Sequence, residues 1–144
     1  MELLNQLSIP RALSLFPTNT VEANCLAPDA VGNCVYITGP KIADYYQVTT
    51  ANPLDGAIKM PAVGVIIEKL SPTLCKVQVT GEMKGIVTGL TPGRVVYVSS
   101  AGTLSHSLAS PAVGQLAYIQ SMGVAGSSDV VLVVPDFSII KRLG

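Results

Sequence analysis

The chain has 144 residues, 49% of them apolar and only 12% charged, and its nine basic and nine acidic residues cancel at neutral pH. The charges are scattered singly, which excludes a basic stripe able to follow a phosphate backbone, so we expect no binding to nucleic acid. So few charged residues leave little polar surface to wrap a monomer, and we therefore expect part of the apolar surface to meet a partner.

Length and hydropathy predict one soluble domain. The chain is long enough to bury a core without disulfides or a metal. The N-terminus lacks the positive leader and apolar stretch of a secretory signal, and the longest apolar runs, near 60–67 and 130–134, are shorter than the roughly 18 residues of a transmembrane helix. We expect synthesis in the cytoplasm and no membrane partner.

The first segment, residues 1–33, mixes apolar side chains with Ser, Thr, Asn and three prolines and has no clean period. We interpret it as an extended arm followed by an irregular lead-in, with room for a short helix over 2–7 that Pro10 would stop. Its apolar residues are too numerous for a solvated tail. We predict that they lie on a surface, either their own or that of a neighbouring chain: Leu3, Leu4, Leu7, Ile9, Leu13, Leu15 and Phe16.

The central segment, residues 34–135, has the composition of a β domain. Its apolar runs are rich in Val, Ile, Tyr and Thr, as strands prefer, and short. We predict strands over 34–38, 45–50, 63–69, 74–80, 85–87, 95–99, 115–120 and 130–134.

For two of these strands, the pattern of apolar residues predicts which side chains are buried. In 74–80 the partial alternation predicts that Lys76 and Gln78 face solvent while the intervening apolar residues face the core. The run 130–134 does not alternate, so we expect both of its faces to be covered, one by the core and the other by more of the core or by a neighbouring subunit.

The connections carry explicit turn chemistry. Thr91-Pro92-Gly93-Arg94 has Pro and Gly where a type II turn needs them, and Ser100-Ala101-Gly102-Thr103 predicts a hairpin loop with Gly102 in the left-handed conformation. Further reversals are expected at 71–73 and 126–129. Strands this short and this evenly punctuated predict an all-β fold, a small barrel or sandwich.

The residues that carry chemistry form no catalytic pattern. His106 is the only histidine, and no G-x-S-x-G elbow accompanies it, so we predict a surface or interface histidine. Cys25, Cys34 and Cys75 form an odd set without a CxxC pair, which predicts buried free thiols and no metal. The acidic residues that stand out look like turn residues: Asp29, Asp55 and Asp129. We therefore predict no enzyme, no cofactor and no small-molecule substrate.

A motif in the second half resembles a known family. It consists of a Pro-Gly turn, a Tyr-containing strand, a Gly turn, a Gly-Val-Ala strand and a final apolar strand, at 89–99, 101–104, 114–115, 122–125 and 130–133. It is similar to the small β-barrel of tailed-phage capsid decoration (cement) proteins and the related head-fibre and tail-fibre domains. The likeness extends more loosely to the first half, which also has a Val-Tyr strand followed by Pro-Ala-Val-Gly.

The resemblance implies a β-tulip-like barrel on the capsid exterior, commonly a homotrimer, with arms that grip neighbouring subunits. It implies the major capsid protein as partner and no catalytic residues. In that setting the C-terminal extension, residues 136–144, would use Phe137, Ile139 and Ile140 to close the trimer or touch the shell. A C-terminal strand that merely completes the barrel is an equally good interpretation.

An alternative from another class is a receptor- or glycan-binding domain of a phage tail or head fibre. Glycan sites pair aromatic faces with polar side chains, and Tyr45-Tyr46, at the start of a loop region reaching Gly56, is the only candidate pair. Exposed loop tyrosines without a ligand are the simpler interpretation.

Overall fold

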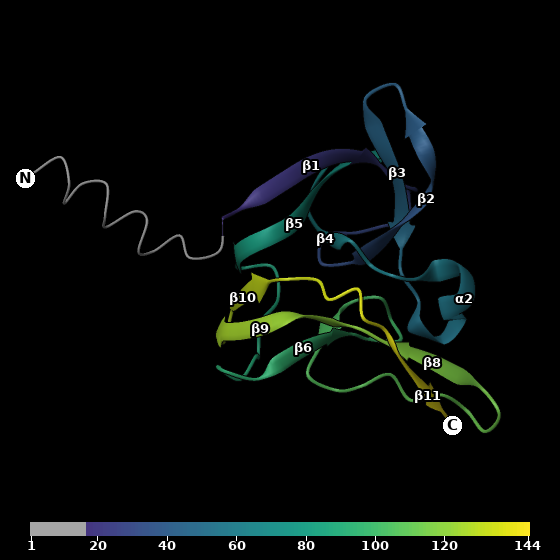
Figure 1. Cartoon of the computed structure of the whole chain (residues 1–144). Coiled ribbons are helices and arrows are strands. Elements are labelled where there is room, and N and C mark those ends of the chain that lie inside the picture. Colours follow the sequence, from purple (N-terminus) through teal and green to yellow (C-terminus); the bar gives the residue numbers. More distant parts are fainter. Residues whose placement is uncertain (1–16) are drawn as a thin grey trace, which may run out of the picture.

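The computed structural model describes residues 17–144, and nearly all of its regular secondary structure is strand (Figure 1). Within residues 17–144 the helical elements are the 3-10 helix η1 (Pro53–Asp55) and the single-turn helix α2 (Gly56–Lys59). The strands are β1 (Asn19–Asn24), β2 (Cys34–Ile42), β3 (Tyr45–Thr50), β4 (Gly64–Ser71), β5 (Leu74–Lys84), β6 (Val95–Val98), β7 (Leu104–Ser105), β8 (Leu116–Ile119), β9 (Ser121–Ser127), β10 (Val130–Val133) and β11 (Ile140–Leu143). The predicted all-β class is confirmed.

The first five strands close into a barrel in the order β1-β3-β2-β4-β5, with β1 paired again to β5. Closure depends on β1, which is antiparallel to β5, with Val21 opposite Val77, and parallel to β3, with Ala23 opposite Tyr46. In Figure 1 the barrel is the upper part of the molecule, seen along its opening.

Strand β1 corrects the prediction of an irregular lead-in up to residue 33. Residues 19–24, Asn-Thr-Val-Glu-Ala-Asn, have little strand propensity of their own, and partners on both sides define the strand. The barrel therefore begins at Asn19 and not at residue 34.

The second half extends the same sheet beyond the barrel. Strand β5 is long enough to pair with β10 after it leaves the barrel, with Met83 opposite Val131, and β9, β6 and β7 follow in that order. Strand β11 pairs with β8 in a separate two-stranded sheet, with Ile140 opposite Ile119. The C-terminal segment therefore does not complete the barrel.

Two cores share the walls β2 and β4. Successive residues of a strand point to opposite faces, so Val35 and Ile66 pack inside the barrel while Cys34 and Val65 pack into a second core outside it. That second core lies between the barrel wall and the sheet of β10, β9 and β6. Two-sided burial explains why these strands read as continuous apolar runs.

Predicted and observed strands differ at β5. It continues to Lys84, and the predicted strand over 85–87 is absent because Gly85 has φ of 77° and turns the chain away. Gln78, predicted to face solvent, is only 3% exposed, and its Nε2 donates to the carbonyls of Thr80 and Glu82. Hydrogen bonds to its own strand satisfy this buried amide.

Strand β10 is covered on one face only. Val131 and Val133 are buried in the second core, whereas Leu132 on the other face is half-buried and Val134, just past the strand, is 47% exposed. Within residues 17–144 the predicted second cover is therefore missing.

The turn predictions are confirmed. The amide of Arg94 donates to the carbonyl of Thr91, and Gly93 has φ of 83°, as a type II turn requires. Gly102 has φ of 79° in the loop that joins β6 to β7. In each case the glycine supplies a conformation that other residues rarely adopt.

One end of the barrel is closed by polar contacts. The buried Asp29 carboxylate accepts hydrogen bonds from the amide of Leu26 and from the hydroxyls of Thr49 and Thr50. Burial alone would raise the pKa of Asp29, but these hydrogen bonds outweigh it and hold the pKa below 3.8. Lys69 Nζ donates to the carbonyls of Leu26, Asp29 and Pro72, which fastens the loop after β1 across this end.

Candidate functional site

The single histidine holds a turn in place. Its Nε2 accepts from the amide of Thr91 at 2.9 Å, and its Nδ1 donates to the carbonyl of Val95 at 2.9 Å. Both ring nitrogens of His106 are thus occupied by backbone groups on either side of the type II turn. This geometry suits a structural brace and leaves no free ring nitrogen to act as a base in this arrangement.

The three cysteines are buried free thiols, as predicted. Burial raises the pKa of Cys34 to about 12, and burial together with the neighbouring Cys25 thiol raises that of Cys75 to about 12. Such thiols stay protonated and behave as small apolar side chains. Among residues 17–144 no three His, Cys, Asp or Glu side chains gather as metal ligands, and no helix is long and apolar enough to cross a membrane.

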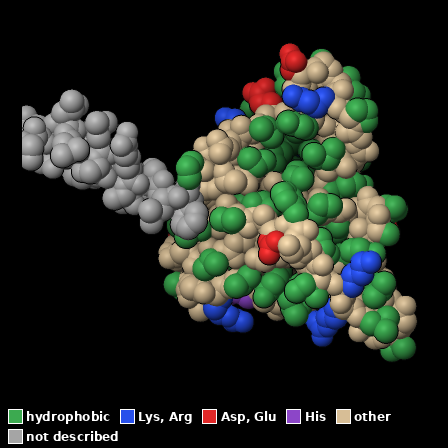
Figure 2. Space-filling view, in the orientation of Figure 1, with side chains coloured by type: hydrophobic (Ala, Val, Ile, Leu, Met, Phe, Trp, Pro, Cys, Tyr) green, Lys and Arg blue, Asp and Glu red, His purple; other side chains and the backbone are tan. Residues whose placement is uncertain are grey.

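The open end of the barrel is an apolar cavity of about 190 Å³, which we call the barrel mouth. Val48 and Val77 are buried and form its floor, and the exposed Ile37 and Tyr46 form its rim. The walls come from the half-buried side chains Val21, Val63 and Val79. Figure 2 shows apolar side chains around a hollow over the barrel.

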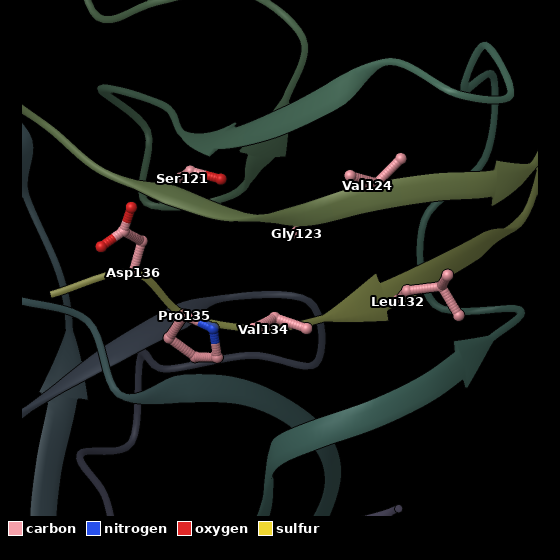
Figure 3. A pocket seen from close by; sticks show the side chains of 7 residues that line it. All are labelled: Ser121, Gly123, Val124, Leu132, Val134, Pro135 and Asp136. Carbon is pink, nitrogen blue, oxygen red and sulfur yellow. The ribbon is translucent and has the colours of Figure 1, made fainter. Parts of the chain in front are cut away.

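A second apolar hollow, of about 420 Å³, lies on the uncovered face of β9 and β10 (Figure 3). We call it the β9–β10 groove. Val124 and Leu132 lie at one end, and Ser121 and Asp136 lie at the other. At Gly123 the two strands approach so closely that any Cβ would overlap the Leu132 carbonyl, so only glycine fits there.

The tyrosine pair does not form a single aromatic platform. Adjacent residues of a strand point to opposite faces, so Tyr45 and Tyr46 diverge. Lys41 Nζ lies 4.5 Å from the centroid of the Tyr46 ring and occupies one side of it, while the ring also lines the barrel mouth. Tyr46 is therefore already engaged, with apolar neighbours where a sugar would need polar ones.

The predicted interface residues fall into two groups. Those of the arm, from Leu3 to Phe16, lie outside the described residues. Phe137 and Ile140 are 61% and 68% exposed, and Ile139 is half-buried. Ile140 belongs to β11, where it lies opposite Ile119 of β8.

Comparison with models of known protein families, with curated proteins and with solved structures gave no match.

Neither hollow was predicted from the sequence. The alternation in β5 correctly placed Val77 and Val79 on one inner face, but it gave no sign that this face ends in an opening. The one signal for the β9–β10 groove was the apolar run 130–134, which predicted that both faces of this strand are covered. Within residues 17–144 one of these faces is uncovered, and it lines the groove.

Proposed function

We propose that this chain is a virion structural protein, a capsid decoration (cement) protein that binds the outside of a tailed-phage head and stabilises it. The observation that carries the proposal is the uncovered apolar surface at two places, the barrel mouth and the β9–β10 groove. Apolar hollows on a rigid strand scaffold suit docking to other chains. The resemblance of residues 89–133 to decoration proteins supplies the class.

In this proposal the partner is the major capsid protein, and the chain acts as a homotrimer on the capsid exterior. The arm residues 3–16 lie against a neighbouring chain, and the exposed Phe137 and Ile140 contribute to the trimer or to the shell contact. A protein that binds the assembled shell better than free subunits stabilises the shell by mass action.

The direct test is binding of the purified protein to expanded capsids that lack it. We expect saturable binding, and decorated capsids that survive heating at temperatures where bare capsids open. Electron micrographs would place the protein on the outer face of the head. Equal heat resistance with and without the protein, together with no binding, would remove the proposal.

Removal of residues 2–16 tests the arm. Thr18 packs against Gly81 and Asn19 begins β1, so truncation before Pro17 keeps every described strand of the barrel. We expect unchanged circular dichroism and thermal unfolding but a marked loss of capsid binding. Asn5→Ala combined with Ser8→Ala, which keeps every apolar arm residue, is the matched control and should bind normally. Normal decoration by the truncated protein would contradict the role of the arm.

The alternative, a receptor- or glycan-binding domain of a fibre, has weaker support because Tyr46 is engaged by Lys41 and the barrel mouth. Glycan-array and host-cell binding separate the two functions. Specific glycan binding that Tyr45→Ala or Tyr46→Ala abolishes, without capsid binding, would favour the fibre domain.

A further inference from the structure

The lining of the barrel mouth defines the chemistry of what can fill it. All seven lining residues are Val, Ile or Tyr, and none is charged. A polar group entering the cavity would lose its hydration without gaining hydrogen bonds, which is costly. The occupant must therefore be apolar.

The size of the barrel mouth suits one apolar side chain. An apolar protein cavity of about 150 Å³ is large enough to bind benzene. At about 190 Å³ the barrel mouth can take a phenyl ring or a branched aliphatic side chain. Because the floor residues Val48 and Val77 are already buried, the occupant would mainly cover the exposed Ile37 and Tyr46 at the rim.

The arm joins the described part of the chain next to one wall of the barrel mouth. The hydroxyl of Thr80 donates to the carbonyl of Pro17 at 2.9 Å, and Thr18 lies against Gly81, where a Cβ would clash with it. Val79 and Val21, one residue from Thr80 and three from Thr18, line the cavity.

The sixteen residues before Pro17 offer eight large apolar side chains, Met1 among them, and only two charged ones, Glu2 and Arg11. Extended, a segment of this length reaches roughly 50 Å. A fully extended arm of this length reaches well past its own barrel mouth, toward a neighbouring chain.

We propose that the barrel mouth is the receptor for the arm of a second copy, with apolar side chains from residues 3–16 of one chain filling the mouth of the next. This inference rests on the proposed function, in which the arm crosses to a neighbouring chain, and adds the place where it binds. It requires the full-length protein to self-associate in solution through the arm.

Photo-crosslinking tests the contact directly. p-Benzoylphenylalanine replaces Phe16 or, separately, Leu7 in full-length protein, and unlabelled and ¹⁵N-labelled protein are unfolded together, refolded and irradiated. We expect arm peptides joined to peptides containing Ile37, Tyr46 or Val79, with labelled and unlabelled partners combined. Crosslinks confined to a single isotope would show an arm bound to its own barrel and would overturn the proposal. Crosslinks to the β9–β10 groove would overturn it as well.

A rim substitution tests whether the barrel mouth drives association. Ile37→Asp places a charge at the rim, and Thr38→Asp, the next residue of β2 and also exposed, is the matched control. By sedimentation we expect a wild-type oligomer, retained in Thr38→Asp and lost both in Ile37→Asp and on deletion of 2–16. Circular dichroism checks that each variant is folded. A monomeric wild type, or an oligomer that survives Ile37→Asp, would overturn the inference.

These results also separate this inference from the proposed function. If Ile37→Asp still self-associates while deletion of 2–16 abolishes capsid binding, the arm docks elsewhere and the decoration role stands. If the arm crosslinks to the barrel mouth but no variant binds capsids, the docking stands and the decoration role fails.

Discussion

The two ends of the barrel differ: one is closed by polar contacts, and the other opens into an apolar cavity. At the closed end, the Asp29 carboxylate accepts from the Leu26 amide and from the hydroxyls of Thr49 and Thr50 in β3, and Lys69 donates to carbonyls of the loop after β1. At the open end, Ile37 and Tyr46 surround an apolar cavity without polar partners. The same strands form both ends, so strand propensity does not explain the contrast. The closed end is complete within a single chain, and the open end is the surface that another chain would complete.

The largest loss of stability is expected from Asp29→Ala, which removes the polar contacts at the closed end of the barrel. The substitution leaves the amides of Leu26 and Thr50 and the hydroxyls of Thr49 and Thr50 without their carboxylate acceptor. We expect the free energy of unfolding to fall by about 3 kcal/mol, measured by urea denaturation. Asp44→Ala, at an exposed position between β2 and β3, should change it little. Equal losses in the two variants would show that Asp29 does not secure this end.

Part of the contribution of Asp29 should depend on pH. Because the folded state holds the pKa of Asp29 below 3.8, the charged form stabilises the fold above that pH, and this stabilisation is lost as the pH falls through the folded pKa. We expect unfolding free energies measured from about pH 5 downward to fall less steeply in Asp29→Asn than in the wild type. Parallel pH profiles would contradict the assignment.

Truncating a floor residue of the barrel mouth should lower the free energy of unfolding more than truncating a wall residue. Val77→Ala removes two buried methyl groups and should cost about 2 kcal/mol, whereas Val79→Ala, only half-buried, should cost about 1 kcal/mol or less. Thermal and urea unfolding of arm-deleted protein would measure both without a contribution from the arm. A Val79→Ala loss as large as that of Val77→Ala would mean that the mouth is covered within residues 17–144.

The smallest loss of stability is expected from removing the Lys41 cation at the rim of the barrel mouth. Lys41→Ala removes an exposed cation–π contact with Tyr46 and should change the unfolding free energy by about 0.5 kcal/mol or less. Lys41→Arg should preserve the contact. A loss well above this size in Lys41→Ala would show that the β2–β3 hairpin, and not the apolar lining, shapes the open end.

Local chemistry accounts for the parts of the fold that the sequence predicted correctly. Strand β3 matches its predicted range of 45–50, and Gly93 and Gly102 stand at the turns because few other residues tolerate a positive φ. Strand β1 and the burial of Gln78 were missed because they depend on partners distant in the chain. For the candidate site, the sequence predicted the arm residues, which stay a prediction, and a cover on both faces of 130–134, which residues 17–144 do not provide. It predicted neither hollow.

By itself, the sequence determined the all-β class, the short strands and the glycine turns between them. Only the tertiary structure decided that β1 closes a five-stranded barrel, that β10 is covered on one face, and that one barrel end is open. The physical reason is that alternation fixes the face to which a side chain points, whereas long-range pairing decides what lies opposite that face.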